Sequence, residues 1–113
     1  MKTVYISGAY TADNTFERDM NVKRANMEAI KWAEDGWAPY CPHTQSRNWE
    51  NDSNLSYEDF LAIDKEWIKR VDAIAMLPGW QKSNGARKEH QWAIEFGMPR
   101  YYCYLEQWEG YNE

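Results

Sequence analysis

Residues 77–97 read Leu77-Pro-Gly-Trp-Gln-Lys-Ser-Asn-Gly-Ala-Arg-Lys-Glu-His-Gln-Trp-Ala-Ile-Glu-Phe-Gly97, and this stretch decides the fold. It predicts the end of a strand, an irregular loop and a helix. Ser83 or Asn84 is placed to cap that helix, and Gly97 is placed to end it. Residues 72–76 before it, which are apolar after Asp72, predict a short buried strand. A strand, a glycine-containing loop and a helix in this order form the ligand-binding edge of open α/β sheets.

The remainder of the chain alternates strand and helix in the same way. A β-rich run begins almost at the first residue, and apolar residues then recur at helical spacing from about Thr15 to Gly36. A second short strand contains Pro39, which favours an edge position. A second amphipathic helix starts at Ser56, in a pattern that resembles a capping box. The predicted strands are Thr3–Ser7, Trp37–Cys41, Asp72–Leu77 and Arg100–Leu105.

A helix between successive strands implies right-handed crossovers and a parallel sheet. We predict one α/β domain over residues 1–113, with a three-layer flavodoxin- or Rossmann-like fold. Its parallel sheet is expected to have about four to five strands, in the order 2-1-3-4. That order brings the loops at residues 8–15 and 78–84 to one cleft. Residues 42–55 are rich in Asn, Ser, Asp and Arg, and they are predicted to form a loop long enough to act as a lid.

The bulk composition limits the classes of function. A net charge of −5 argues against binding to a nucleic-acid polymer, which requires a basic surface. The chain shows neither an apolar run long enough to cross a bilayer nor a signal-peptide pattern, so we expect a cytoplasmic protein without a membrane partner. Seven Trp and eight Tyr exceed what so small a core encloses, which subunit contact and base stacking explain equally well. Cys41 and Cys103 lack metal-ligand spacing and are expected to be buried free thiols.

Two carboxylates are the candidates for catalysis. Glu89 lies about one turn inside the helix predicted within residues 77–97, where the positive helix end favours the ionised form that suits a nucleophile. The alternative is a glutamate that only stabilises its helix. Asp64 shares a predicted helical stripe with Ile68, just before the third strand. It is placed to handle the proton on a leaving group, or alternatively to be an exposed partner of Lys65 or Lys69.

Polar and flexible residues after the predicted strands are candidates for substrate binding. Ser83, Asn84 and Gly85 offer a hydroxyl and backbone N–H groups to a phosphate, although a serine in this place is more often only a helix cap. Gly8 and Tyr10 follow the first strand, where they are placed to contact a sugar or a base. A tight turn and a surface aromatic explain these two residues equally well.

The histidines differ in their positions. His43 follows the second strand and is a candidate general acid or phosphate donor. His90 adjoins Glu89 but points about 100° away from it on a helix. Neither histidine has the neighbours of a metal site, and the P-loop pattern for ATP is absent. We therefore expect neither a metal nor a cofactor.

Taken together, these motifs resemble those of the nucleoside 2-deoxyribosyltransferase and nucleotide N-glycosidase superfamily, particularly its small bacterial and phage branch, the DUF4406-like proteins. The resemblance covers most of the chain. The motifs that carry it are Tyr5-Ile-Ser-Gly-Ala-Tyr10, Asp35-Gly36, Asp64-Lys-Glu-Trp67 with Asp72, Leu77-Pro-Gly-Trp80 and Ser83-Asn-Gly-Ala-Arg-Lys-Glu89. The last two of these motifs together are the most specific.

The resemblance implies hydrolysis or transfer of the N-glycosidic bond of a nucleoside or a nucleoside 5′-monophosphate. It implies that Glu89 attacks the anomeric carbon and that Asp64 assists the departing base. Ser83 stands where the monophosphate hydrolases of the family have the serine that faces the 5′-phosphate. The loop after the first strand departs from the family, because Ala9 and residues 11–14 do not reproduce the glycine- and arginine-rich loop of those hydrolases, so another arginine would have to serve the phosphate. The conceivable substitutes are Arg18, Arg47 and Arg87.

Members of the superfamily form homodimers or larger assemblies, and Trp108 and Tyr111 would suit such a contact. Three other functions are weighed against the N-glycosidase. One is a non-catalytic module that binds or sequesters a nucleotide, and another is a glycohydrolase of NAD-type dinucleotides. The third is a purely structural dimerisation protein.

Overall fold

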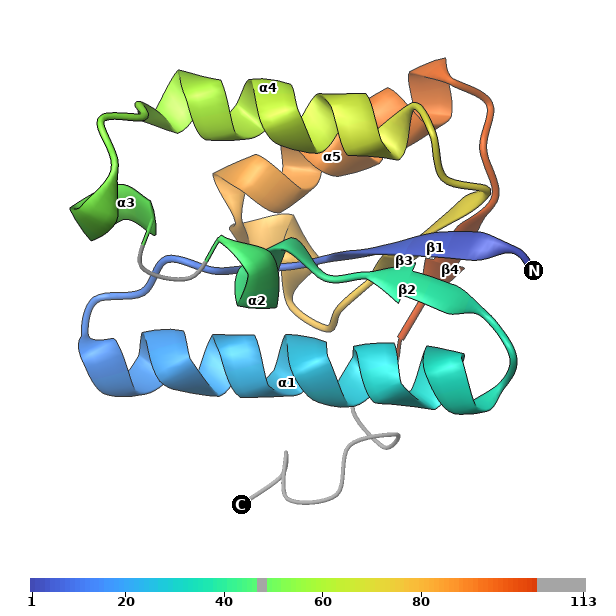
Figure 1. Ribbon diagram of the computed structural model, residues 1–113, viewed down its shortest axis with the longest axis horizontal. Helices are drawn as coiled ribbons and strands as arrows, with labels where there is room; N and C mark the ends of the chain where they lie inside the picture. The colour runs from blue at the N-terminus through green and yellow to red at the C-terminus, as the bar shows by residue number, and fades with distance from the viewer. Residues whose placement is uncertain (47–48, 104–113) are drawn as a thin grey trace.

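A four-stranded parallel sheet forms the centre of the protein in the computed structural model, which describes residues 1–46 and 49–103. The strand order is β2-β1-β3-β4, and each neighbouring pair is parallel (Figure 1). The predicted fold class and strand order are confirmed. The strands are β1 Thr3–Ser7, β2 Ala38–Tyr40, β3 Ala73–Met76 and β4 Arg100–Tyr102.

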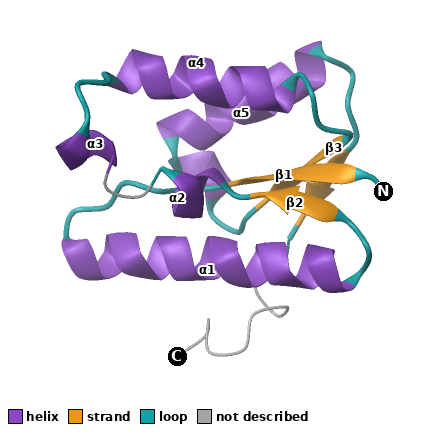
Figure 2. Ribbon diagram, in the orientation of Figure 1, coloured by secondary structure: helices purple, strands orange, loops and turns teal. Residues whose placement is uncertain are grey.

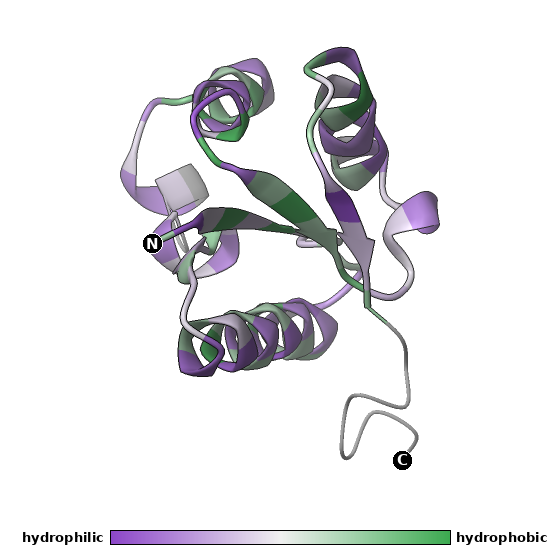
Figure 3. Cartoon of the chain, turned by 90° about the vertical axis from the view of Figure 1, so that its right-hand side faces the viewer, coloured by the Kyte–Doolittle hydropathy of each residue, from purple (hydrophilic) through white to green (hydrophobic). Residues whose placement is uncertain are grey.

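Helices cover both faces of this sheet. Helix α1 lies along one face, whereas α4 and α5 lie side by side on the other (Figures 1 and 2). The same three layers are visible end-on in Figure 3, where apolar colouring marks the central strands between the helices. The helices are α1 Thr15–Glu34, α2 Pro42–Gln45, α3 Trp49–Asp52, α4 Tyr57–Ile68 and α5 Asn84–Glu95, with a 3₁₀ turn η1 at Trp80–Lys82.

Successive side chains of β1 point to opposite faces of the sheet. Val4 and Ile6 belong to the apolar cluster under α1. Tyr5 belongs to the cluster under α4 and α5, and Ser7 contacts Glu89 of α5 on the same side. The central strand therefore places a phenol and a hydroxyl on the face that the two catalytic candidates share.

The predicted helix ends are confirmed. Ser83 caps α5, because its side chain accepts a hydrogen bond from the backbone N–H of Ala86. Ser56 and Asp59 form a reciprocal capping box at the start of α4. Gly97 follows α5 with φ = 65°, a left-handed conformation that suits glycine. These ends fix where the chain enters and leaves the helices that carry the carboxylates.

The prediction of a continuous loop over residues 42–55 is wrong, because this segment contains α2 and α3. Pro42 occupies the first turn of α2, where its fixed φ favours a helix and its missing N–H costs no hydrogen bond. The strands are shorter than predicted at β2 and β3. Leu105, the predicted end of the last strand, lies outside the described residues, as do Trp108 and Tyr111.

Both cysteines are free, and they are half-buried rather than fully enclosed as predicted. Burial raises the pKa of Cys41, and burial together with Glu28 raises that of Cys103. Across the described part of the chain, no helix is both long and apolar enough to span a membrane.

Candidate active site

Glu89 is a buried carboxyl held by the central strand. It is 6% exposed and lies on the side of α5 that faces the sheet. Ser7 Oγ donates a hydrogen bond of 2.6 Å to Glu89 Oε1, and the hydroxyl of Tyr5 donates one of 2.9 Å to Oε2. Each oxygen thus has its own donor from β1, so the carboxyl is fixed in place.

Asp64 brings a second carboxyl to this position from α4. It is half-buried, and it lies close enough to Glu89 and Tyr5 for both side chains to affect its pKa. Burial raises the pKa of Asp64 to about 6, and the neighbouring Glu89 and Tyr5 offset part of this increase. The two helices thereby join their carboxyl groups above β1.

The charge state of Glu89 differs from the expectation that the helix end favours the ionised form. Burial, followed by the charge of Asp64, raises the pKa of Glu89 to about 8, and hydrogen bonds from Ser7 and Tyr5 only partly offset this. Desolvation of Glu89 and the negative charge of the neighbouring Asp64 raise its pKa by more than the partial positive charge of the helix end lowers it, because the effect of the helix end falls off within about one turn. The pair therefore holds a single proton between about pH 6 and about pH 8.

Tyr5 and Ser7 are site residues that sequence reasoning missed. They lie two positions apart in an otherwise apolar strand, so a period-2 reading places both on one face. Tyr5 is fully buried, and burial together with Glu89 raises its pKa well above the usual value. Its proton is therefore firmly held, which suits a permanent hydrogen-bond donor to Glu89.

The predicted residues Gly8, Tyr10 and His43 gather around the loop that follows β1. A side chain on Gly8 would meet Leu77 at 2.6 Å, so this glycine permits close contact between two loops. His43 is buried, its Nε2 lies 2.9 Å from the carbonyl oxygen of Ala9, and its ring meets Tyr10 edge-on at 5.5 Å. Burial lowers the pKa of His43. The close approach to Leu77 accounts for Gly8 without a ligand, and Tyr10 is half-buried against the ring of His43 rather than a surface aromatic.

Ser83, Asn84 and Gly85 gather at the start of α5. The Ser83 hydroxyl acts as the helix cap, and Asn84 Oδ1 accepts a hydrogen bond from Arg87. Gly85 lies close to the hydroxyl of Tyr57, since a Cβ at this position would be 3.7 Å from that oxygen. Of the possible substitutes for the missing arginine, Arg47 lies outside the described residues.

Hydrogen bonds therefore hold Tyr5 and Ser7 against Glu89, and Asp64 lies beside this group. The other predicted residues form two separate groups, one at each adjoining loop. Among the residues that the structure describes, no group of three or more His, Cys, Asp or Glu side chains is arranged to hold a metal.

A protein-family model described as a domain of unknown function, DUF4406, matches residues 2–102. The chain belongs to this family. The DUF4406 match includes all four strands and both carboxylates, and it confirms the resemblance found in the sequence. No curated protein matches the chain.

Solved structures share the fold of this DUF4406 protein. One is the CMP N-glycosidase BcmB of Clostridium botulinum, with a TM-score of 0.61 and 20% identity over 98% of this chain and 81% of that chain. Another is the solution structure of BlsM, with a TM-score of 0.66 and 18% identity over 96% of this chain and 68% of that chain. At these identities the likeness establishes the shared architecture.

Proposed function

We propose that this DUF4406 protein cleaves the N-glycosidic bond of a deoxynucleoside or a nucleoside 5′-monophosphate, with Glu89 as the nucleophile. The observation that carries the proposal is the contact between the carboxyl groups of Glu89 and Asp64, fixed by two hydroxyl donors from β1. A structural glutamate would need neither a second carboxyl nor a fixed orientation. Two neighbouring carboxyl groups that hold one proton between them can supply a nucleophile and a general acid.

In the resting pair the proton lies on Glu89, whose pKa is the higher of the two. Attack therefore requires transfer of this proton to the neighbouring Asp64, which leaves Glu89 as the carboxylate and Asp64 as the acid. Glu89 attacks the anomeric carbon as the carboxylate while the bond from that carbon to the base breaks, and the electron pair of that bond leaves with the base. Asp64 supplies the proton that the departing base requires. Ser7 and Tyr5 keep one carboxylate oxygen each in hydrogen bonds and thereby set the direction of attack. Water or a second base then takes the sugar from Glu89, and the carboxylate is restored.

The substrate class is supported by two further observations. The fold is shared with a protein named as a CMP N-glycosidase, and a nucleoside monophosphate is therefore the first substrate to test. The start of α5 carries Ser83 and Gly85, and the backbone N–H groups of a first helical turn attract an anion. We assign the phosphate to this side, and the sugar and base to the side of Tyr10 and His43.

The test is base release from the common nucleosides and deoxynucleosides and their 5′-monophosphates, CMP among them, followed by chromatography of the free base. We expect Glu89→Gln to lower kcat at least about 1,000-fold, as losses of catalytic carboxylates commonly do. Asp64→Asn should also lower kcat, with a smaller loss for substrates whose base leaves easily. Asp59→Asn on the exposed cap of α4 is the matched control.

Undiminished turnover in Glu89→Gln would refute the role of this residue. Binding of a nucleotide without release of base from any member of the panel would instead identify a sequestering module.

A further inference from the structure

A pocket of about 410 Å³ opens on the side of α5 away from the carboxyl pair. This volume is within the range of roughly 300–1,000 Å³ that small-molecule sites occupy. The pocket lies between α5 and the start of α4. Its lining residues are Tyr57, Asn84, Arg87, Lys88 and Gln91, and we call it the Lys88 pocket.

The Lys88 pocket is cationic on a molecule whose net charge is −5. Arg87 and Lys88 are its charged lining residues, and both are exposed. The guanidinium of Arg87 is held over the helix start, because it donates hydrogen bonds to the carbonyl oxygen of Gln81 and to Asn84. The ammonium of Lys88 lies 5.6 Å from the centre of the Tyr57 ring. The arrangement combines a fixed cation with a flexible one, and it favours an anionic ligand.

The Lys88 pocket adjoins the place to which we assign the 5′-phosphate. Asn84 belongs both to the pocket and to the first turn of α5, and Lys88 follows it by one helical turn. One turn of helix rises about 5.4 Å, which the long lysine side chain spans. A second phosphate attached to the first would therefore lie near Arg87 and Lys88.

We propose that the Lys88 pocket binds the second phosphate of a nucleoside 5′-diphosphate, so that the protein prefers such a nucleotide to the monophosphate. The inference rests on the proposed function for the position of the nucleotide. Arg87 and Lys88 act as residues that set specificity, and they take no part in breaking the glycosidic bond. A free pyrophosphate offers the same charge, so it forms a separate arm of the test.

The experiment compares deoxynucleoside 5′-mono- and diphosphates as substrates, and as ligands in titration calorimetry, for wild type and Lys88→Gln. We expect Lys88→Gln to raise KM and Kd for the diphosphate about tenfold, the range of one hydrogen bond to a charged group. KM and Kd for the monophosphate should change less than about twofold, because it has no second phosphate to contact Lys88 and an exposed charge at longer range contributes little. The matched control is Lys69→Gln, at the far end of α4.

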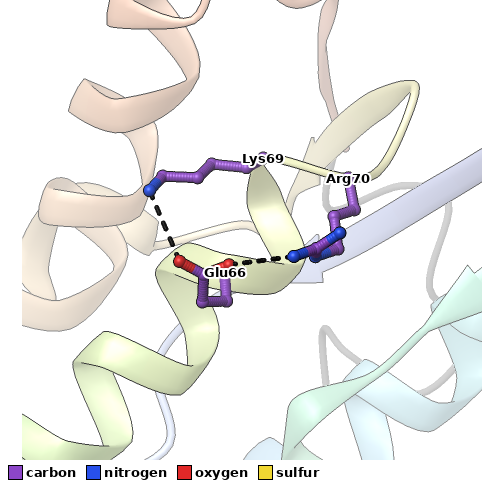
Figure 4. A network of polar contacts seen from close by, with 3 residues as sticks. All are labelled: Glu66, Lys69 and Arg70. Atoms are coloured by element: carbon purple, nitrogen blue, oxygen red, sulfur yellow. Dashed lines mark hydrogen bonds and ion pairs between the residues drawn. The ribbon is translucent and has the colours of Figure 1, made fainter.

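Lys69 is an exposed lysine whose ammonium lies 3.4 Å from Glu66, which also pairs with Arg70 at 3.3 Å (Figure 4). Its loss changes the net charge by the same amount as the loss of Lys88 while leaving the pocket intact. Lys88→Arg, which keeps the charge, should restore most of the preference. A general effect of charge would appear equally in Lys69→Gln and would overturn the assignment of the pocket.

The outcomes separate this inference from the proposed function. Diphosphate binding that weakens only in Lys88→Gln supports the pocket even if no base is released, in which case the proposed function alone fails. Base release with equal KM for both phosphates in wild type and Lys88→Gln overturns the pocket and leaves the proposed function standing. Binding of inorganic pyrophosphate without any preference for the diphosphate nucleotide also overturns the inference.

Discussion

At the scale of single residues, the Glu89 carboxyl is subject to two opposing influences. Burial and Asp64 raise its pKa to about 8, whereas the hydroxyls of Ser7 and Tyr5 lower it. A carboxyl that accepts two fixed hydrogen bonds and yet keeps a raised pKa is oriented for reaction without being fully stabilised as the anion. Ionisation of this group in the folded protein therefore costs free energy, and it lowers the free energy of unfolding.

The sign of the pH dependence follows from the direction of the shift. The pKa of Glu89 rises from 4.5 to about 8 on folding, so between these values the folded protein binds more protons than the unfolded chain. The contribution of Glu89 to stability is complete below about pH 4.5 and is lost as the pH rises toward about 8. We expect Glu89→Gln to be more stable than wild type at pH 8 by at least about 1 kcal/mol, and less so at pH 5.

Urea unfolding of both proteins from pH 5 to pH 8 measures this difference. Asp64, whose pKa is raised to about 6, titrates together with Glu89, so the difference between the two proteins reports on the pair. Burial also lowers the pKa of His43, but this contribution is common to both proteins and cancels in the comparison. A difference between wild type and Glu89→Gln that stays constant with pH would contradict the raised pKa.

At the scale of elements, the start of α5 combines a helix cap with the proposed phosphate site. Asp replaces Ser well as a cap, so Ser83→Asp should keep α5 intact while placing a negative charge beside the phosphate. We expect kcat/KM to fall at least about tenfold for the monophosphate through charge repulsion, and to change little for the nucleoside. The measurement is the ratio of the two rates.

Ser56→Asp at the cap of α4 is the matched control for this substitution, and it should leave the ratio unchanged. Equal losses on both substrates in Ser83→Asp would show that the cap, rather than the phosphate contact, governs activity.

The elements show which features a sequence of this kind predicts. Caps such as Ser83, the edge strand with Pro39 and the strand order were predictable, because they depend on local chemistry and on the rules of parallel connection. The two short helices between β2 and α4 were not, because polar composition conceals a single turn of helix. The raised pKa of Glu89 was not predictable either, since it requires the depth of burial and the approach of Asp64 from another helix.

At the scale of the whole molecule, the site depends on two distant loops meeting at the edge of the sheet. The chain leaves β1 at Gly8 and leaves β3 at Leu77, and the two residues touch where the strand order reverses. The carboxyl pair sits on one side of this contact, and the loop that holds Tyr10 continues from it to His43 of α2. Any substitution that separates the loops would therefore disturb both sides of the site together.

Gly8→Ala tests this contact. Its methyl group would lie 2.6 Å from Leu77 Cδ1 and 2.7 Å from Leu77 Cβ, and the latter atom is fixed by the backbone. We expect a loss of about 1–3 kcal/mol in the free energy of unfolding, as for other overpacked cores. Gly85→Ala is the matched control, because its methyl group would make an ordinary contact at 3.7 Å from the Tyr57 hydroxyl. Gly85 is the second residue of α5, so the gain of roughly 0.5–1 kcal/mol that alanine brings to a helix interior is an upper limit there. Urea unfolding should show Gly8→Ala to be less stable than Gly85→Ala by at least about 1 kcal/mol. Equal stabilities would mean that the loops part freely, and the close approach at Gly8 would then have no role in assembling the site.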